Sequence, residues 1–541
     1  MDAQQEDSFR SEQSRKVCVI GAGVAGLLAL KECLSEGFEV HCFEARGEIG
    51  GQWAQQPDVV QTGATATATV QSSIYDGVVL NSCRDTSALP DFPLDPARYG
   101  DYYGHKLQRR YLDEYAEHFG LEKHIQLNTR VVACKPCADD NGWTVSVQRP
   151  GSDEMHESRY RAVLVCVGHL STPTTPHWEG LDSYKGELLH SHNYRRPGPF
   201  EQKKVAIIGF GSSAVDIACE LAPGAEEVHV ISRRGGWVLP RYVLGKPTEA
   251  WDNRATQAWL PISMAQWLQT KLLQILEGEA PKEMRPKHKL LEQSPTVRGD
   301  FVEKVRTGSI AVHRGSVQRL SKAGVVVALG EGGATKEIQA DVIIACTGYN
   351  QFDYGFLPDD VIRSAETPSN RVDLYKLMVS PRYPNLFIMG HAEVVGPAAP
   401  VFDAQARWAC AVLSGRVSLP GQEQMRAEVA EFQAWQSKHF LGSERHALMV
   451  YNIQYMEDLL APLGANPSFG RCLARVFTSG HPWRALKVLD AVWFGIPSAA
   501  QWRLFGYGAK EELAEETLLR IAAGRDALSE GEKRLLGRGA E

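Results

Sequence analysis

Two glycine-rich segments carry the residues with the clearest chemical meaning in this 541-residue sequence. In the first, Gly21, Gly23 and Gly26 come between an apolar stretch, KVCVI, and a helix-like stretch, LLALKECLSEG. In a G-x-G-x-x-G turn the first glycine allows the tight bend, the second lets the backbone approach a pyrophosphate, and the third lets helix and strand pack closely. Because a helix N-terminus also favours phosphate, we predict a bound dinucleotide at this turn.

The second segment, GFGSSA, repeats the pattern further along the chain. Gly209 and Gly211 hold the first two positions, and an alanine stands at the third, a substitution that the pattern allows. Ser212 and Ser213 bring hydroxyl donors to the start of the expected helix, and Asp216 lies one turn inside it. We expect these residues to contact a second dinucleotide.

The charge at the end of the next strand predicts which dinucleotide each segment binds. Glu44 closes the strand after the first segment, where a carboxylate can accept hydrogen bonds from ribose hydroxyls. Arg233, followed by Arg234, occupies nearly the same place after the second segment. A carboxylate there would repel a 2′-phosphate, whereas a guanidinium can bind it with two hydrogen bonds. We therefore expect FAD at the first segment and NADPH at the second.

The order of apolar and helical stretches predicts an α/β protein with two Rossmann-type dinucleotide-binding domains, the second inserted in the first. Two further strands, at 161–169 and 340–349, contain Val, Leu, Ile and Ala without alternation, which suits burial on both faces of a sheet. The expected divisions are a disordered tail at 1–14, an FAD domain at 15–185 that resumes at 336–525, an NADPH domain at 186–335, and a polar tail at 526–541.

A helical insertion is expected at about 251–298, because this stretch fits neither pattern of strands and helices. Its apolar residues recur mostly at spacings of three or four, which indicates an amphipathic face. They are Trp259, Met264, Trp267, Leu268, Leu272, Ile275 and Leu276. We favour packing of this face onto the body of the protein, and contact with a membrane surface or a second subunit is the alternative.

Composition excludes several classes of protein. The net charge of −7 gives no electrostatic reason to expect nucleic acid. Eleven cysteines without repeated short spacing indicate reduced thiols, and the polar N-terminus lacks a signal segment, so we expect a cytoplasmic protein. The sequence contains no run of eighteen apolar residues, so it predicts no membrane-spanning helix. The stretch GATATATV, residues 63–70, is expected to be a loop or an exposed hairpin.

Outside the two dinucleotide segments the sequence resembles the flavin-containing monooxygenase family, the dimethylaniline monooxygenase type of class B flavoproteins. YKGELLHSHNY, residues 184–194, is similar to the identifying motif of the family, with Tyr184, Gly186, His190 and Tyr194 at its marked positions. The segments EIGGQW, NSCRDTSALPDFP and CTGYN resemble its flavin-contacting, active-site and late-strand segments. The match runs from about residue 15 to 525, but the polar end GEKRLLGRGAE departs from the apolar membrane tail of many animal members.

The resemblance implies roles for particular residues. Asn81 would lie at the reactive edge of the flavin, and Ser82, Gln52 and Trp53 would line the ring. Gln405 would lie near it. We interpret His190 as a hinge or cofactor-positioning residue rather than as an acid or base, because its motif lies between the domains.

The function implied is NADPH-driven oxygenation of a small molecule at an amine nitrogen or sulfide sulfur, with dioxygen as co-substrate and a flavin hydroperoxide as the oxygenating species. Such nucleophiles need no general base. Baeyer–Villiger oxygenation of a ketone is an alternative within this chemistry, although Tyr194 stands where those enzymes carry Trp. The pair Cys134 and Cys137 leaves open a disulfide reductase, and a nucleotide-binding scaffold without turnover is a third alternative. No metal site is predicted, His105 and His118 are interpreted as surface residues, and a homodimer is left open.

Overall fold

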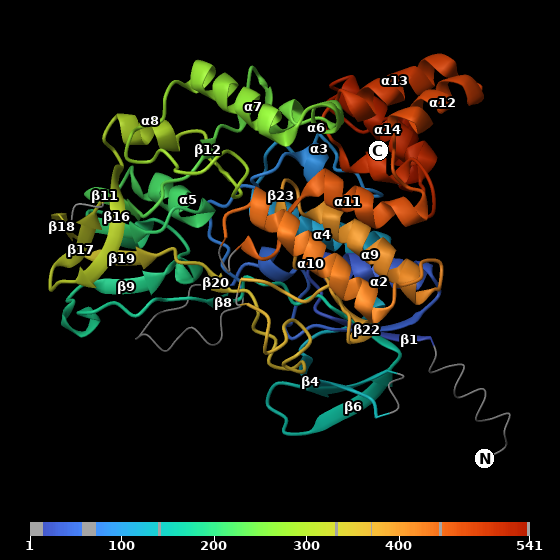
Figure 1. The fold of residues 1–541 in the computed structure, drawn as a ribbon, viewed down its shortest axis with the longest axis horizontal. Coiled ribbons are helices and arrows are strands. Elements are labelled where there is room, and N and C mark those ends of the chain that lie inside the picture. The colour runs from blue at the N-terminus through green and yellow to red at the C-terminus, as the bar shows by residue number, and fades with distance from the viewer. Residues whose placement is uncertain are drawn as a thin grey trace.

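The structure is a computed structural model that describes residues 15–56, 72–138, 142–330, 334–368, 370–442 and 446–537. The tail expected at 1–14 and the stretch GATATATV therefore lie outside the described residues. Two sheets organise the described part of the chain, and each is built around one of the glycine-rich segments (Figure 1).

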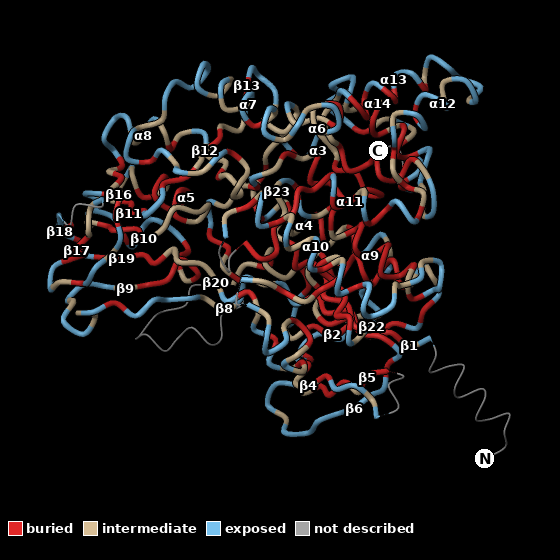
Figure 2. The backbone as a smooth tube through the Cα atoms, viewed as in Figure 1, coloured by how far each residue is buried: buried red, intermediate tan, exposed pale blue. Residues whose placement is uncertain are grey.

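The first sheet is central to one half of the molecule. Its strands lie in the order β21 (Val379–Ser380), β22 (Tyr383–Ile388), β7 (Ala162–Val165), β1 (Lys16–Ile20), β2 (Glu39–Phe43) and β3 (Ile125–Gln126). β1 runs parallel to both β2 and β7, and these strands are buried along most of their length (Figure 2). Helices cover this sheet, and α2 (Val24–Ser35) packs against α9 (Ala399–Leu413). This cover explains why the strands are apolar without alternation.

The second sheet forms the other half. Its strands lie in the order β18 (Ala334–Gln339), β17 (Gly324–Leu329), β16 (Ala311–Leu320), β11 (Glu227–Ser232), β10 (Lys204–Ile208), β19 (Val342–Ala345) and β9 (Glu187–His190). α5 (Ser212–Leu221) follows β10 and packs against α8 (Phe301–Arg306). The strands β9, β10, β11 and β19 are mutually parallel.

The position of β19 corrects one predicted boundary. The sequence analysis ended the second domain at residue 335, but β19 pairs with β10 and β9, so the second sheet continues to Ala345. The strand pattern alone could not decide this, because a strand buried on both faces reads the same in either sheet. The two chain segments that join the domains then run antiparallel where β8 (Thr172–Pro173) pairs with β20 (Tyr349–Asn350). The inserted arrangement of two α/β domains is confirmed.

Helices and short strands complete the first half and the upper edge in Figure 1. An antiparallel sheet contains β4 (Arg130–Pro136), β5 (Trp143–Gln148) and β6 (Met155–Tyr160). The short strands are β12 (Val238–Leu239), β13 (Tyr242–Val243), β14 (Lys246–Pro247), β15 (Thr296–Val297), β23 (Glu393–Val395) and β24 (Met449–Tyr451). The further helices are α3 (Arg84–Ser87), α4 (His105–His118), α6 (Arg254–Trp259), α7 (Ile262–Glu277), α10 (Gln422–His439), α11 (Asn452–Leu460), α12 (Phe469–Thr478), α13 (Pro482–Trp493), α14 (Glu511–Ala522) and α15 (Glu530–Leu535).

Two of these helices differ from the prediction. α15 belongs to the folded body, because Ser529 and Glu532 form a capping box and the buried Glu532 pairs with Arg520 of α14. Residues 526–537 are therefore part of the fold and not of the predicted polar tail. In the expected insertion α7 is present, but of its sixteen residues only Gln266 is buried, so most of its apolar face is not packed onto the body, whereas Trp259 of α6 stacks on Trp493. In the described part of the chain no helix is long and apolar enough to cross a bilayer.

Candidate active site

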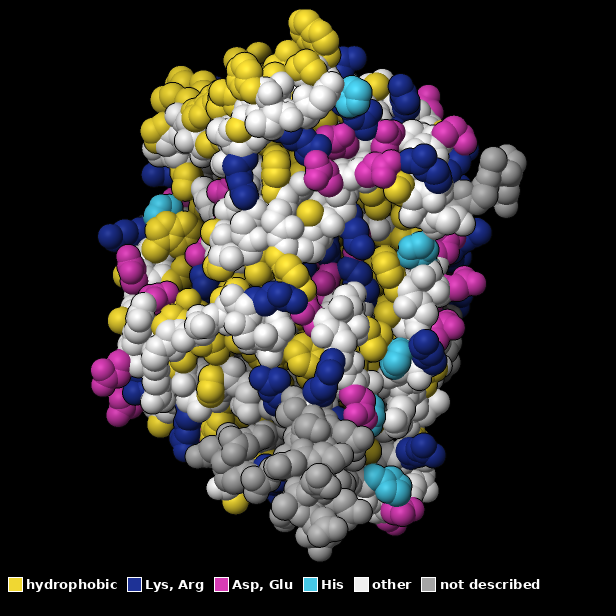
Figure 3. Space-filling view, turned by 90° about the vertical axis from the view of Figure 1, so that its right-hand side faces the viewer, with side chains coloured by type: hydrophobic (Ala, Val, Ile, Leu, Met, Phe, Trp, Pro, Cys, Tyr) yellow, Lys and Arg dark blue, Asp and Glu magenta, His cyan; other side chains and the backbone are white. Residues whose placement is uncertain are grey.

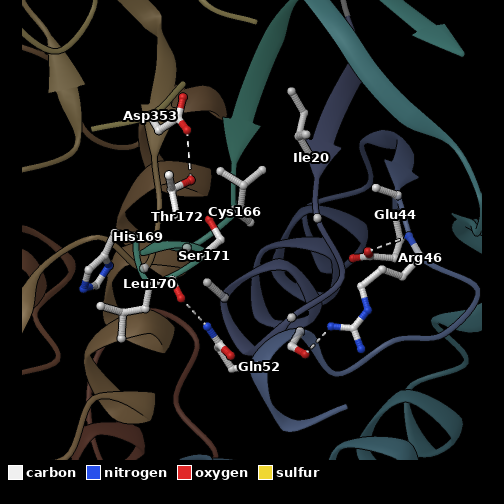
Figure 4. A pocket seen from close by; sticks show the side chains of 18 of the residues that line it. Ile20, Glu44, Arg46, Gln52, Cys166, His169, Leu170, Ser171, Thr172 and Asp353 are labelled. Atoms are coloured by element: carbon white, nitrogen blue, oxygen red, sulfur yellow. Dashed lines mark hydrogen bonds between the residues drawn. The ribbon is translucent and has the colours of Figure 1, made fainter. Parts of the chain in front are cut away.

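A cavity of about 1170 Å³ is lined by residues of both sheets. Gly21 and Glu44 of the first β-α-β unit line one part, and His190 at the end of β9 lines another. Figure 4 shows Glu44 and His169 on opposite sides of the cavity, with Cys166, which directly follows β7, between them. The cavity therefore extends from the first glycine-rich turn to the segment that joins the domains, a length suited to an extended dinucleotide.

The glycines of the first turn lie so close to neighbouring backbone that there is no space for a side chain. Gly21 has a φ of +99°, and a Cβ on Gly26 would lie 1.9 Å from the carbonyl oxygen of Gly21. Gly51, in the turn before Gln52, has a φ of +57°, and a Cβ there would lie 2.9 Å from the Cα of Gly23. Two glycine turns thus face each other across the N-terminus of α2, whose first amides favour a phosphate. This cradle fits the diphosphate of FAD.

Glu44 is fixed at the end of β2 with both carboxylate oxygens in hydrogen bonds. Oε2 accepts the backbone N–H of Ala22 at 2.7 Å, and Oε1 accepts the N–H of Arg46 at 3.0 Å. Each oxygen can accept a second bond, so the group can still receive the ribose hydroxyls. Arg46, which the sequence analysis missed, donates to the carbonyls of Gly51 and Ala54 at 2.8 Å each and so holds the second glycine turn in place.

Gln52 and Trp53 both line the cavity, as the resemblance implied for residues near the flavin. Gln52 donates from Nε2 to the carbonyl of Leu170 at 2.7 Å, and its Oε1 accepts the N–H of Ser73 at 3.1 Å. The Gln52 amide therefore connects the turn after Gly51 to the segment that follows β7. Both contacts are consistent with a fixed wall rather than a mobile side chain.

Two imidazoles line the far part of the cavity, and both are neutral at physiological pH. Burial lowers the pKa of His169 to about 4. Burial, together with the neighbouring His192, lowers the pKa of His190 to about 4, and its Nδ1 accepts the backbone N–H of His192 at 3.0 Å. A ring held in this way at the end of β9 suits a positioning role. His169 was not singled out from the sequence, and only its place after a buried strand could have indicated it.

The second glycine segment lies at the start of α5, outside this cavity. Gly209 has a φ of +131°, and a Cβ there would meet the carbonyl oxygen of Cys346 at 2.3 Å. Gly211 caps α5, and Ser212 and Ser213 occupy its first turn, half-buried. The same geometry of tight turn and free helix amides therefore occurs twice, as the sequence predicted, and the second copy fits a second diphosphate.

Arg233 and Arg234 lie exposed after β11, and no ion pair joins either to another described residue. Arg314, on the neighbouring β16, lies level with Ser232 and donates from Nη2 to the carbonyl of Arg234 at 3.1 Å. Arg314 thus brings a third guanidinium to the segment that follows the end of β11. Arg314 lies far from the glycine segment in the sequence, so no motif predicted its place. Strand pairing brings it beside Arg234.

The profile of the flavin-binding monooxygenase-like family matches residues 14–523. The chain belongs to this family. It is an NADPH-dependent flavin monooxygenase with FAD and NADP as its cofactors.

Relatives of this flavin monooxygenase cover almost its whole length. It is 32% identical to flavin-containing monooxygenase 5 of Cavia porcellus, over 91% of this chain and 89% of the relative. It is also 32% identical to dimethylaniline monooxygenase (N-oxide-forming) 2 of Rattus norvegicus, over 92% of this chain and 90% of the relative. Among solved structures, S-allyl-L-cysteine S-oxygenase from Allium sativum matches with a TM-score of 0.62 at 25% identity, over 87% of this chain and 93% of the other.

Three residues expected at the flavin do not line the cavity in the described part of the monooxygenase. Asn81 is exposed and Ser82 half-buried, in a turn held by the N–H of Cys83, which donates to Glu249 Oε1 at 2.8 Å. Gln405 is fully buried, and its Oε1 accepts the N–H of Gly390, a cavity residue, at 2.9 Å. Gln405 thus supports the cavity wall from behind, through Gly390.

Asp216 was expected to contact the second dinucleotide but instead joins the two domains. Its Oδ2 accepts the phenol of Tyr75 at 3.1 Å, and Arg298 Nη1 lies 3.4 Å from Oδ1. Asp216 is 7% exposed, and burial raises its pKa. The bonds to Tyr75 and Arg298 therefore occupy both oxygens of this carboxylate, one helical turn inside α5.

The remaining candidates do not form a second reactive centre. Cys134 and Cys137 lie on β4 or just past its end, and burial raises the pKa of Cys134 to about 12, the opposite of what a redox thiolate needs. Among the described residues no three His, Cys, Asp or Glu side chains are placed to hold a metal ion. His118 is exposed as expected, whereas His105, expected at the surface, is buried at the start of α4.

Proposed function

We propose that this monooxygenase transfers one oxygen atom of dioxygen to an amine nitrogen or a sulfide sulfur of a small molecule, while the other atom leaves as water and NADPH becomes NADP⁺. When bound, the flavin supplies the redox chemistry, taking hydride from NADPH and activating dioxygen. The protein supplies the binding cradles, the positions of the reactants and an enclosed site.

The single observation that carries this proposal is a flavin-sized cavity whose imidazoles are both neutral near pH 7. Because the pKa values of His169 and His190 are near 4, neither serves as a proton donor there. An amine or sulfide attacks oxygen through its own lone pair, so the reaction needs no proton donor from this wall. The names of two relatives support the class: one is N-oxide-forming and another is an S-oxygenase.

The residue roles are part of the proposal. Gly21, Gly23 and Glu44 hold the diphosphate and ribose of FAD, with Gln52 and Trp53 beside the ring. Gly209, Gly211 and the serines that follow hold the NADPH diphosphate, while Arg233, Arg234 and Arg314 receive the 2′-phosphate. His190 positions the two cofactors at the domain junction. Asn81 and Ser82 contact the reacting edge once both cofactors are bound, which requires the turn that carries them to move toward the cavity.

The first experiment follows the flavin spectrum. Holoprotein reduced anaerobically with NADPH is mixed with aerated buffer, without substrate and then with N,N-dimethylaniline, a dialkyl sulfide or cyclohexanone. We expect a persistent spectrum, distinct from oxidised and reduced flavin, that decays faster with the amine or the sulfide as N- or S-oxide forms. Lactone from the ketone alone would replace the proposal with Baeyer–Villiger chemistry. Immediate return to oxidised flavin with stoichiometric peroxide and no oxygenated product would overturn it.

A further inference from the structure

The stretch that connects β11 to β16 has two parts with different surroundings. α7 leaves most of its apolar face exposed, at the upper end of the molecule where Figure 3 shows hydrophobic side chains gathered. β13, β14 and the turn at Thr248–Trp251 instead contact the half of the molecule that is built on the first sheet. The ring of Tyr242 on β13 meets Tyr102 of that half edge-on, with centroids 5.4 Å apart. The stretch therefore reaches from the second half of the molecule to the first.

Glu249, in that turn, joins the two halves through both oxygens of its side chain. Oε1 accepts the backbone N–H of Cys83, two residues after Asn81, at 2.8 Å. Oε2 lies 2.8 Å from the phenol oxygen of Tyr102. One carboxyl group therefore bonds to two places in the first half, and one of these places is the turn that carries Asn81.

The position of Glu249 is fixed from the second half. The N–H of Thr248 donates to the carbonyl of Arg241 at 3.0 Å, which closes the turn on the β13–β14 hairpin. This hairpin follows directly on β12, and β12 pairs with β15. Arg298, the residue after β15, forms an ion pair with Asp216 of α5. Glu249 is thus connected to the helix that begins at the second glycine segment, where NADPH fits.

The contacts of Tyr102 indicate the protonation state of Glu249. The phenol oxygen lies 2.6 Å from the carbonyl oxygen of Arg241 and 2.8 Å from Oε2 of Glu249. A phenol has one proton, so it can donate to only one of these two oxygens. When Glu249 is protonated, its O–H donates to Tyr102 and the phenol donates to Arg241, so that each contact contains a hydrogen. Desolvation of the half-buried carboxyl group also raises its pKa, and no cation pairs with it among the described residues.

We propose that Glu249 is a positioning residue which, in its protonated form, fixes the Asn81 turn to the half of the molecule that binds NADPH, so that the place of Asn81 follows the occupancy of the nucleotide site. The inference rests on the role proposed above for Asn81 at the reacting edge of the flavin. Glu249 does not line the cavity, so it acts through the turn and not on the cofactors. The protonated group forms both bonds without adding a negative charge beside the turn.

Residue-resolved hydrogen exchange of the FAD-loaded protein tests the bond without turnover. Glu249→Gln keeps both contacts, because its amide oxygen accepts the N–H of Cys83 and its NH2 group donates to Tyr102, as a protonated carboxyl group does. Glu249→Ala removes both. We expect the Cys83 amide to exchange at least about tenfold faster than in the wild type in Glu249→Ala, and within about twofold of the wild type in Glu249→Gln. The Arg84 amide, which donates to the carbonyl of Asp101 at 2.7 Å, should be unchanged in all these proteins.

Addition of NADP⁺ tests the coupling between the halves. We expect NADP⁺ to slow exchange at Ser82 and Cys83 in the wild type and in Glu249→Gln, but not in Glu249→Ala. Glu283→Ala, exposed in the same stretch between β11 and β16, is the matched control and keeps this protection. Substrate-free oxidation of NADPH should be at least about tenfold faster in Glu249→Ala, because the reacting edge is less enclosed, while KM for NADPH stays within about twofold.

An unchanged Cys83 amide in Glu249→Ala would overturn the inference, and so would equal protection by NADP⁺ in all four proteins. Exchange in Glu249→Gln as fast as in Glu249→Ala would show that the group is ionised and would overturn the protonated form. Absence of oxygenated product from the wild type would remove the role of Asn81 while leaving the exchange results in place. Failure of the proposed function is thereby distinguished from failure of this inference.

Discussion

Arg503 and Asp403 form an ion pair inside the protein, with Arg503 Nη2 2.6 Å from Asp403 Oδ1 and both side chains 1% exposed. The same Nη2 lies 2.6 Å from Oε1 of Glu32, on the helix that begins at the FAD cradle. One guanidinium therefore joins α2, α9 and the turn before α14. Burial opposes the charged state of Arg503, yet its carboxylate partners hold its pKa well above the usual range.

Replacing this guanidinium should destabilise the fold strongly. In Arg503→Met the buried Asp403 loses its ion-pair partner and Glu32 keeps only Lys31, and we expect a loss of about 3–5 kcal/mol in the free energy of unfolding. Arg534→Met, which removes an exposed pair with Glu512, should cost less than about 1 kcal/mol. Urea unfolding of both variants measures the difference. Equal losses would show that burial does not govern the energy of the Arg503 pair.

Glu44 should be essential for holding FAD. In Glu44→Ala the adenosine ribose and the N–H of Ala22 both lose their acceptor, and we expect the Kd for FAD to rise roughly ten- to a hundredfold. Equilibrium titration of the apoprotein with FAD gives the value. Glu39→Ala, at the exposed start of the same strand, is the control. If both substitutions change the affinity equally, Glu44 does not contact the cofactor.

Arg233 should distinguish NADPH from NADH. Arg233→Ala removes a charged contact to the 2′-phosphate, so KM for NADPH should rise roughly ten- to a hundredfold, while KM for NADH changes little. Steady-state oxidation of both nucleotides measures the preference, with Arg319→Ala, exposed further along β16, as the control. An unchanged ratio of the two KM values would remove Arg233 from the site, and Arg314 would be the next residue to replace.

The sequence was sufficient for features that depend on local chain geometry, and insufficient for those that depend on pairing between distant segments. Both glycine turns and Glu44 are found as predicted, because spacing within one β-α-β unit fixes their positions. Strand order decides which sheet contains β19, and it also places Arg314 beside Arg234. No local sequence pattern encodes strand order. The face of α7 was recognised as amphipathic, but periodicity gives the face and not what covers it.

Cys134 and Cys137 should be dispensable for turnover. Because burial raises the pKa of the Cys134 thiol to about 12, almost no thiolate forms near neutral pH, and a disulfide cycle lacks its nucleophile. Cys134→Ala with Cys137→Ala should therefore keep NADPH-dependent oxygenation of the amine within about twofold, since alanine leaves no buried hydroxyl without a partner. Product formation is the measurement. Loss of turnover with normal flavin content would favour the reductase.

Stability should fall as the pH drops from about 6.5 toward 4, because His190 is buried in its neutral form. Its pKa is lowered to about 4 in the folded protein, against about 6.5 in the unfolded chain. Between these values the unfolded chain binds a proton that the folded protein does not, so the free energy of unfolding decreases as the pH falls and is constant above both. His190→Asn keeps an acceptor for the N–H of His192 and removes the titration. The decrease in Tm between about pH 7.5 and pH 5 should then be smaller than in the wild type, whereas His156→Asn, exposed on β6, should leave it unchanged. Identical pH profiles for all three proteins would mean that His190 is not buried in its neutral form.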